Sequence, residues 1–303
     1  MSTRTSKRLK EVYENAKKIT FDDSDKFILF SDCHRGDGSW ADDFAHNENV
    51  FFHALNYYYN NEFTYIEIGD GDELWENSRF DDVKEAHSHI FWILSEFYKH
   101  GRLYLIWGNH NSRWRDSTEC RKNLFQYYDE RDHTYKPLFQ DIKVYEGLQL
   151  QYLKTDHTIF LVHGHQADFI NDVTWRFVRF FVRNFWRLLQ LCGVKDPTSP
   201  AKNFKKRNKI EKKLKKWVIE NKQMLIAGHT HRSVYPVPGK APYFNTGSCV
   251  HPRCIVGIEI NNGSITLVKW YVNVKQSNDN GTLFIDRKEL VEPIRLQDFF
   301  NKI

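Results

Sequence analysis

The chain has 303 residues, of which 41% are hydrophobic and 16% aromatic, and its formal net charge is +5. This composition excludes a disordered or fibrous protein and suits one large α/β domain with an insertion. The five cysteines form no Cys-x-x-Cys pair, and no segment supplies the roughly 18 apolar residues of a membrane span or the apolar stretch of a secretory signal. We therefore expect a protein of the reducing cytoplasm.

The first elements in chain order are a short polar helix over residues 5–18, within a lead-in that ends near residue 25. Five apolar segments follow, and each runs directly into a polar cluster, as a buried strand does at a functional loop. Helical segments at about 45–60 and 82–99 separate the earlier strands, which predicts an α/β fold with parallel pairing. The five expected strands are 26–31, 64–68, 103–107, 158–162 and 224–227.

A β-hairpin is expected near the end of the main domain, residues 26–275. Two apolar runs, 254–260 and 264–271, flank Asn261-Asn262-Gly263, and Asn-Gly is typical of a tight hairpin turn. We expect this hairpin to complete a second sheet. Residues 276–303 are treated as a C-terminal extension.

Metal-ligand residue types recur at the ends of the expected strands. Asp32 and His34 are two residues apart, so both side chains can face one cation. The pair His229 and His231 repeats this spacing, and Asp70 follows Gly69, where a single carboxylate can bridge two cations. Alone, a cluster such as Asp32 with His34, or Asp70, is more often part of an ordinary loop or turn, but their combination in one chain points to a metal centre.

Two further clusters complete the pattern. Asn109 offers a neutral amide oxygen, and the adjacent His110 can approach whatever the metal ions bind. His163 ends an apolar strand, where a buried histidine with a hydrogen-bond partner is the alternative. Because ligands gather beyond the carboxyl ends of parallel strands, we expect all five clusters to meet at one rim.

The order Asp-x-His, Gly-Asp, Gly-Asn-His, His-Gly-His and Gly-His-x-His resembles that of the calcineurin-like metallophosphoesterases, over about residues 26–260. The resemblance implies an αββα sandwich of two mixed sheets with a helical cap insertion. It also implies two divalent ions, one held by Asp32, His34 and His231 and the other by Asn109, His163 and His229, with Asp70 bridging them.

The resemblance implies a mechanism in which a metal-bridging hydroxide attacks phosphorus and His110 protonates the leaving oxygen. Oxygen and imidazole ligands without thiolate suit Mn²⁺, our first choice, and also Fe or Zn²⁺. Family members commonly carry an acid after Gly-Asn-His, whereas this chain has Asn111. We expect Asp72 or Glu73 to supply the missing carboxylate.

The segment of about residues 169–222 carries most of the positive charge. From residue 175 to 222 there are 15 basic and three acidic side chains. We predict a basic helical cap that contains a lysine-rich helix, with nine basic residues between Lys202 and Lys216. A stripe of arginines at spacings of three, four and four precedes this helix and consists of Arg176, Arg179, Arg183 and Arg187.

This basic segment has two interpretations. It is either a helix that packs aromatic residues on the core with solvated arginines, or a surface for a lipid-bearing or polyanionic substrate at an anionic membrane. A lysine-rich stripe also suits nucleic acid.

A narrower resemblance links the runs 69–76, 163–168 and 228–232 to the UDP-2,3-diacylglucosamine pyrophosphatase branch, whose members cleave a diphosphate beneath a helical cap. That branch typically has Gly-Asn-Arg where this chain has Gly-Asn-His. The resemblance adds His165 and Arg232 to the four arginines as candidate substrate-binding residues.

The leading hypothesis is therefore a phosphodiester or pyrophosphate hydrolase that acts on a lipid-linked or nucleotide-linked molecule. One alternative is a phosphomonoesterase acting on a phosphoprotein or a small phosphorylated molecule. A second alternative, from another class, is a non-catalytic scaffold that binds a membrane or nucleic acid.

Overall fold

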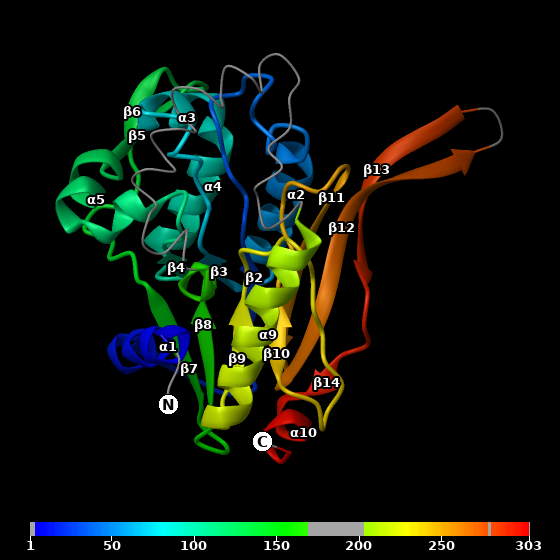
Figure 1. The fold of residues 1–303 in the computed structure, drawn as a ribbon. Helices are drawn as coiled ribbons and strands as arrows, with labels where there is room; N and C mark the ends of the chain where they lie inside the picture. The colour runs from blue at the N-terminus through cyan, green and yellow to red at the C-terminus, as the bar shows by residue number, and fades with distance from the viewer. Residues whose placement is uncertain (1–3, 169–202, 278–279, 303) are drawn as a thin grey trace.

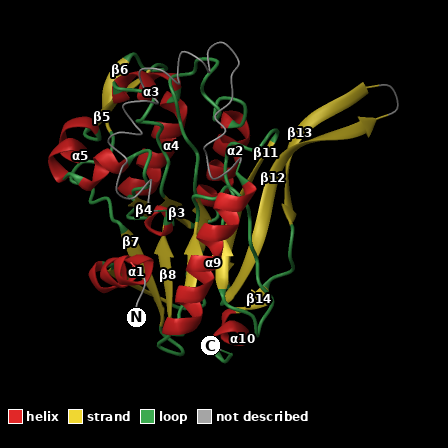
Figure 2. Cartoon of the chain, viewed as in Figure 1, coloured by secondary structure: helices red, strands yellow, loops and turns green. Residues whose placement is uncertain are grey.

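The computed structural model describes residues 4–168, 203–277 and 280–302. Its strands form a five-stranded sheet, a seven-stranded sheet and a small hairpin of β5 (Gln126–Asp129) and β6 (Thr134–Pro137) (Figures 1 and 2). The five-stranded sheet has the order β1 (Lys17–Phe21), β7 (Gly147–Tyr152), β8 (Thr158–Val162), β9 (Met224–Ala227) and β10 (Tyr243–Asn245). The seven-stranded sheet has the order β13 (Asn280–Glu289), β12 (Ser264–Ser277), β11 (Cys254–Asn261), β2 (Phe27–Phe30), β3 (Thr64–Ile68) and β4 (Leu103–Ile106), with β14 (Ile294–Arg295) beside β12.

Most helices occupy the outer faces of the two sheets or the connections between strands, whereas the C-terminal α10 packs against the core between the sheets. They are α1 (Arg4–Asn15), α2 (Glu48–Asn60), α3 (Phe80–Ala86), α4 (Ser88–Lys99), α5 (Ser117–Asn123), α9 (Phe204–Asn221) and α10 (Leu296–Phe300), with short 3₁₀ turns η1 (Ser112–Arg115) and η2 (His165–Ala167). None of the helices within the described residues is long and apolar enough to cross a bilayer.

The layer order follows from the alternation of side chains along each strand. In β2, Leu29 packs between the two sheets, whereas Ile28 packs beneath α2 and α4. In β8, Leu161 packs between the sheets, whereas Phe160 packs against α1 and α9. The molecule is therefore an αββα sandwich of two mixed sheets, which confirms the predicted fold class.

The five predicted strands at the polar clusters are all present as β2, β3, β4, β8 and β9. The predicted hairpin is also present, and Asn262 and Gly263 form its two-residue turn at φ values of 50° and 65°. Both values are positive, as a type I′ turn requires. The hairpin does not complete a second sheet, however, because β11 pairs with β2 and so extends the sheet that already contains β3 and β4.

Both ends of the chain are more integrated than the sequence suggested. The predicted N-terminal helix stops at Asn15, and residues 17–21 form β1, which pairs in parallel with β7. At the other end, β13 extends the seven-stranded sheet and α10 buries Phe299 between the sheets. Pairing with strands that are distant in the sequence determines the conformation of both segments, and no local pattern in the sequence reveals such pairing.

The lysine-rich part of the predicted cap is α9. Its residues Leu214 and Trp217 are buried against the five-stranded sheet, with the Trp217 ring 5.4 Å from that of Phe160. In the described residues this helix is thus part of the outer layer that covers the sheet, not a lid over the site. The arginine stripe (Arg176, Arg179, Arg183 and Arg187) lies outside the described residues.

The loop that follows β2 is anchored by a buried histidine. His87 Nε2 lies 2.8 Å from Asp42 Oδ2, and its Nδ1 lies 2.8 Å from Glu48 Oε2. Burial lowers the pKa of His87, but the hydrogen bonds to Asp42 and Glu48 outweigh burial and raise the pKa overall. For Asp42 the two effects have the opposite sign: burial raises the pKa of the carboxyl, but the hydrogen bond with His87 outweighs burial and lowers the pKa overall. The contacts of His87 with Asp42 and Glu48 therefore hold the start of α4 against the loop after His34.

We predict that His87→Gln lowers the free energy of unfolding by about 2–4 kcal/mol, because it leaves the buried Asp42 carboxylate without a cation. The contribution of His87 is complete below its unfolded pKa and is lost as pH rises through its raised folded pKa. The contribution of Asp42 is present above its unfolded pKa and is lost as pH falls through its lowered folded pKa. The difference from wild type is therefore largest between about pH 4 and pH 6.5.

Urea denaturation from pH 4 to pH 9 measures this difference. His46→Gln, at an exposed histidine of the same loop, is the matched control and should change stability little. A difference between wild type and His87→Gln that stays constant across this range would contradict the ion-pair account.

Candidate metal centre

The five polar clusters meet at one rim of the sandwich. Strands β2, β3 and β4 run parallel, as do β8 and β9, and the ends of the two sets approach each other across the sheets. The backbone N–H of His229 donates to Asp32 Oδ2 at 2.9 Å, and His163 Nδ1 lies 2.9 Å from the carbonyl oxygen of Ile68. These contacts join the two sheets at the place where the sequence predicts a metal centre.

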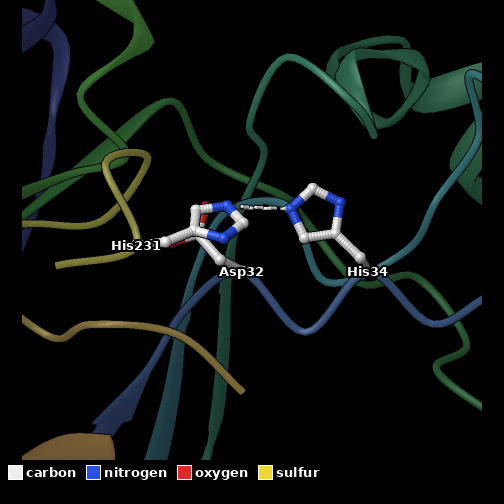
Figure 3. Close-up of side chains that lie close together, drawn as sticks. All are labelled: Asp32, His34 and His231. Atoms are coloured by element: carbon white, nitrogen blue, oxygen red, sulfur yellow. Dashed lines mark hydrogen bonds and ion pairs between the residues drawn. The ribbon is translucent and has the colours of Figure 1, made fainter. Parts of the chain in front are cut away.

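One group of donor atoms comes from Asp32, His34 and His231 (Figure 3). His231 Nε2 lies 3.2 Å from Asp32 Oδ1 and 3.3 Å from His34 Nε2. The distance from His34 Nε2 to Asp32 Oδ1 is 3.9 Å. One carboxylate oxygen and two imidazole nitrogens therefore lie close enough together to bind a single cation.

A second group consists of Asp70, His163 and His229. Asp70 Oδ2 lies 3.0 Å from His163 Nε2, while Asp70 Oδ1 accepts a hydrogen bond of 2.8 Å from the backbone N–H of His110. Asp70 also forms a third group with His34 and His110. Since His34 belongs to the first group, Asp70 links the two halves of the site.

Several buried polar atoms at the rim have no hydrogen-bond partner among the described residues. They include both side-chain amide atoms of Asn109, together with Asp32 Oδ1 and His163 Nε2. A buried polar group without a partner costs about 1–3 kcal/mol and is rare in folded proteins. The atoms of Asn109, Asp32 and His163 belong to predicted ligands, and their oxygen and nitrogen chemistry fits two divalent ions such as Mn²⁺, Fe or Zn²⁺.

The backbone at the rim is strained in the same places. A positive φ is uncommon for a residue other than glycine and costs about 1–3 kcal/mol. Such strain tends to accumulate at functional sites, where the surrounding structure holds it. The predicted ligands with positive φ are Asp32 (53°), His34 (51°), Asp70 (51°), His229 (67°) and His231 (53°).

Two glycines of the motifs are required by close packing. A Cβ atom at Gly108 would collide with the Asp70 carboxylate, and one at Gly228 would collide with Ser31 and the Asp32 carboxylate. Only glycine allows the backbone to come this close to the ligand side chains. The glycines of Gly-Asn-His and Gly-His-x-His therefore set the distance between neighbouring strand ends.

The charges of the site favour cations. Burial raises the pKa of Asp32 and Asp70, but the neighbouring histidines outweigh burial and lower both pKa values, so both carboxylates remain ionised. Burial lowers the pKa of His163, yet the Asp70 carboxylate raises it to about 8. A buried pair of ionised carboxylates among imidazoles is an environment that binds divalent cations.

The outer nitrogens of the ligand histidines are also held in place. His34 Nδ1 lies 2.9 Å from Glu73 Oε2, and His229 Nε2 lies 3.4 Å from Asp168 Oδ2. Asp168 in turn pairs with Lys206 Nζ of α9 at 2.9 Å. Carboxylates of this kind orient metal-binding imidazoles and increase their basicity. Sequence analysis did not assign Asp168 a role, although it lies five residues after His163.

His110 is held by two neighbours from the loop after β3. Its Nδ1 lies 2.6 Å from Glu73 Oε2, an ion-pair contact without the alignment of a good hydrogen bond. The Trp75 ring stacks on the His110 ring, with centroids 4.1 Å apart and planes inclined by 21°. Burial lowers the pKa of His110, but the Glu73 and Asp70 carboxylates raise it to about 9. Sequence analysis assigned Trp75 no role.

The structure distinguishes between the two carboxylates proposed to act on His110. Asp72 lies 2.9 Å from Arg35 Nε and accepts a hydrogen bond of 2.9 Å from Trp114 Nε1, so it holds the loop together. Asn111 Oδ1 accepts a hydrogen bond of 2.6 Å from the Gly108 N–H and closes the turn. Glu73 is therefore the carboxylate that contacts His110.

The remaining predicted substrate residues lie in different environments. His165 is buried beside His163, with ring centroids 5.5 Å apart, and burial lowers its pKa well below the usual range. It is thus a neutral side chain next to the second ligand group. Arg232 Nε donates to the buried Glu211 of α9 at 3.0 Å, so its charge is already paired within the protein.

No protein-family model matches the sequence, and no curated protein shows significant similarity to it. Among solved structures, the fold is similar to a predicted phosphoesterase from Streptococcus pneumoniae TIGR4, at 14% identity and a TM-score of 0.34 over 86% of this chain and 98% of that one. It is also similar to Vacuolar Protein Sorting 29 from Cryptosporidium parvum, at 13% identity and a TM-score of 0.35 over 88% of this chain and 98% of that one.

A third similar structure is the cold-active protein-tyrosine phosphatase of a psychrophilic Shewanella species, at 13% identity and a TM-score of 0.39 over 83% of this chain and 80% of that one. At such identities and TM-scores the similarities carry no part of the functional argument.

We predict that Asp70→Asn lowers the amount of divalent metal bound, from two ions per chain to one or fewer, while the fold is retained. The amide removes the negative charge shared by both ligand groups, and Glu73 and Asp168, which contact the ligand histidines, cannot replace it. Elemental analysis after dialysis against Mn²⁺ measures the content. Asp43→Asn, the same change at an exposed carboxylate, is the control. Two retained ions in a folded Asp70→Asn protein would contradict the bridging assignment.

Proposed function

We propose that this chain is a hydrolase that uses two divalent metal ions to cleave a phosphorus–oxygen bond, in a phosphodiester or a diphosphate. The observation that carries the proposal is the position of Asp70, whose carboxylate belongs to ligand groups on both sides of the rim. Buried atoms at Asn109, Asp32 and His163 that make no hydrogen bond to any described residue support the presence of two ions.

The chain's own residues have distinct roles in this proposal. The seven ligands hold the ions, which when bound lower the pKa of a water molecule and offset negative charge on the phosphate oxygens. Glu73 engages Nδ1 of His110, which leaves Nε2 as the nitrogen that protonates the leaving oxygen. Stacking by Trp75 restricts rotation of the same ring.

The substrate class is a further part of the proposal. Sequence motifs shared with the UDP-2,3-diacylglucosamine pyrophosphatase branch favour a diester or a diphosphate that joins a nucleotide or a lipid. A phosphomonoesterase would use the same metal chemistry.

A substrate panel in Mn²⁺ tests the proposal. We expect faster turnover of bis-p-nitrophenyl phosphate and of UDP-linked sugars than of p-nitrophenyl phosphate, with Asp70→Asn as the inactive reference. A clear preference for the monoester would replace the proposed substrate class, and inactivity on every phosphate ester, with both metal ions bound, would overturn the proposed reaction.

We predict that His110→Ala lowers kcat by about 10²- to 10⁴-fold for alkoxide leaving groups, as expected for the loss of a general acid. The loss should be much smaller for p-nitrophenolate, which leaves without protonation. Metal content should be unchanged, because His110 is not among the seven assigned ligands. His133→Ala, at an exposed histidine of the β5–β6 hairpin, is the control.

Glu73→Gln should show the same dependence on leaving group with a loss of about 10- to 100-fold, as for other residues that orient a catalytic imidazole. Because Glu73 also contacts the ligand His34, the double variant with His110→Ala should be slower than His110→Ala alone, but by less than the product of the two single losses. Equal losses for both leaving groups would contradict the assigned role of His110.

A further inference from the structure

The two helical layers of the sandwich differ in charge. Helices α1 and α9, which cover the five-stranded sheet, together contain twelve basic and four acidic side chains. Helices α2, α3 and α4, which cover the seven-stranded sheet, contain two basic and five acidic side chains. One face of the molecule is therefore strongly cationic, and α9 carries most of that charge.

The cationic side chains of α9 are arranged in a stripe that points away from the protein. Positions 205, 209, 212 and 216 are separated by four, three and four residues, which places them on one side of an α-helix. All four are exposed, whereas the buried residues Leu214 and Trp217 lie on the opposite side. We call this surface the α9 lysine stripe, formed by Lys205, Lys209, Lys212 and Lys216.

Among the described residues, acidic side chains neutralise little of the stripe. In the described part of the chain, only Lys216 of the four has an ion pair, to Glu220 at 3.6 Å. Other cations of the same helix are engaged: Lys206 pairs with Asp168 at 2.9 Å, and Lys213 donates to the carbonyl oxygen of Ala167 at 2.8 Å. Lys206 and Lys213 thus contact the rest of the protein, whereas the lysines of the stripe are exposed to solvent.

Apolar side chains accompany the stripe. Ile219 lies one turn beyond Lys216 on the same side, and its side chain is 65% exposed. Phe204, at the first position of α9, is 62% exposed. An exposed apolar side chain gains free energy where hydrocarbon is present, which suits the interface of a bilayer and contributes nothing along a phosphate backbone.

We propose that the α9 lysine stripe, with Ile219, docks this protein onto an anionic lipid bilayer. The stripe is all lysine, a compact point charge suited to a diffuse negative surface, whereas arginine is preferred where single phosphates are recognised in fixed geometry. The proposal goes beyond the proposed hydrolysis and does not depend on it, because neither metal ions nor catalysis is needed for docking.

The position of α9 also relates docking to the metal centre. Lys206, in the first turn of the helix, contacts Asp168, which contacts His229. A bilayer against the stripe would therefore lie close to the end of the helix that meets the rim. The strength of docking is set by charge, since each lysine near an anionic bilayer contributes roughly fivefold to partitioning.

The test measures co-sedimentation of the whole protein with vesicles of phosphatidylcholine and phosphatidylserine, without added metal ions. The test variant replaces the stripe by glutamine: Lys205→Gln, Lys209→Gln, Lys212→Gln and Lys216→Gln. The matched control makes the same change at four exposed lysines elsewhere: Lys122→Gln, Lys240→Gln, Lys288→Gln and Lys302→Gln. Circular dichroism and thermal unfolding confirm that both variants fold.

We expect wild type and control to bind the anionic vesicles at low salt, and the stripe variant to bind at least about tenfold more weakly. Vesicles of phosphatidylcholine alone should bind none of the three proteins. The Ile219→Ser variant should lose part of the binding that persists at high salt. Equal binding by wild type and the stripe variant, no binding by wild type, or a preference for duplex DNA over the vesicles would each overturn the proposal. If wild type bound the anionic vesicles but hydrolysed no phosphate ester with its metal ions present, the proposed function would be contradicted and this inference would stand.

Discussion

The requirement that strands from two different sheets end at one rim determines the rest of this structure. Asp32 and Asp70 follow strands of the seven-stranded sheet, whereas His163 and His229 follow strands of the five-stranded sheet. Their polar atoms nevertheless lie within hydrogen-bonding distance, as in the contact of 2.9 Å from the His229 N–H to Asp32. The apolar core between the sheets holds the two sets of strand ends in this relative position.

Maintaining this rim costs free energy. Five ligand residues adopt a backbone conformation that disfavours side chains, and several of the buried ligand atoms have no hydrogen bond to any described residue. Each such feature costs on the order of 1–3 kcal/mol in the metal-free protein. Metal ions would satisfy the unpaired atoms, so binding and stability should be linked. The core of the αββα sandwich must supply the stability that the rim does not.

Sequence patterns predicted the parts of the fold that depend on local periodicity. The strands that lead into Asp32, Asp70 and His163 are apolar runs that stop at a polar cluster, so their ends and their ligands were identified together. Strand β1 and the C-terminal β13 depend on pairing with β7 and β12, distant in sequence, and local patterns do not reveal such pairing.

The candidate site was predictable to a similar extent. The spacing of the ligands identified them, but the groups that orient the ligands come from other elements and carry no pattern of their own. Glu73 was one of two candidates, and the structure separates them because Glu73 contacts His110 whereas Asp72 pairs with Arg35. Asp168 and Trp75 required the three-dimensional structure, because their roles are contacts with His229 and His110.

The central claim is that Asp70 bridges two metal ions, and anomalous diffraction from crystals grown with Mn²⁺ tests it most directly. The account predicts two peaks about 3.5–4 Å apart, with the Asp70 carboxylate between them. The ligands of one peak should be Asp32, His34 and His231, and those of the other Asn109, His163 and His229. A single peak, or two peaks that Asp70 does not join, would contradict the account.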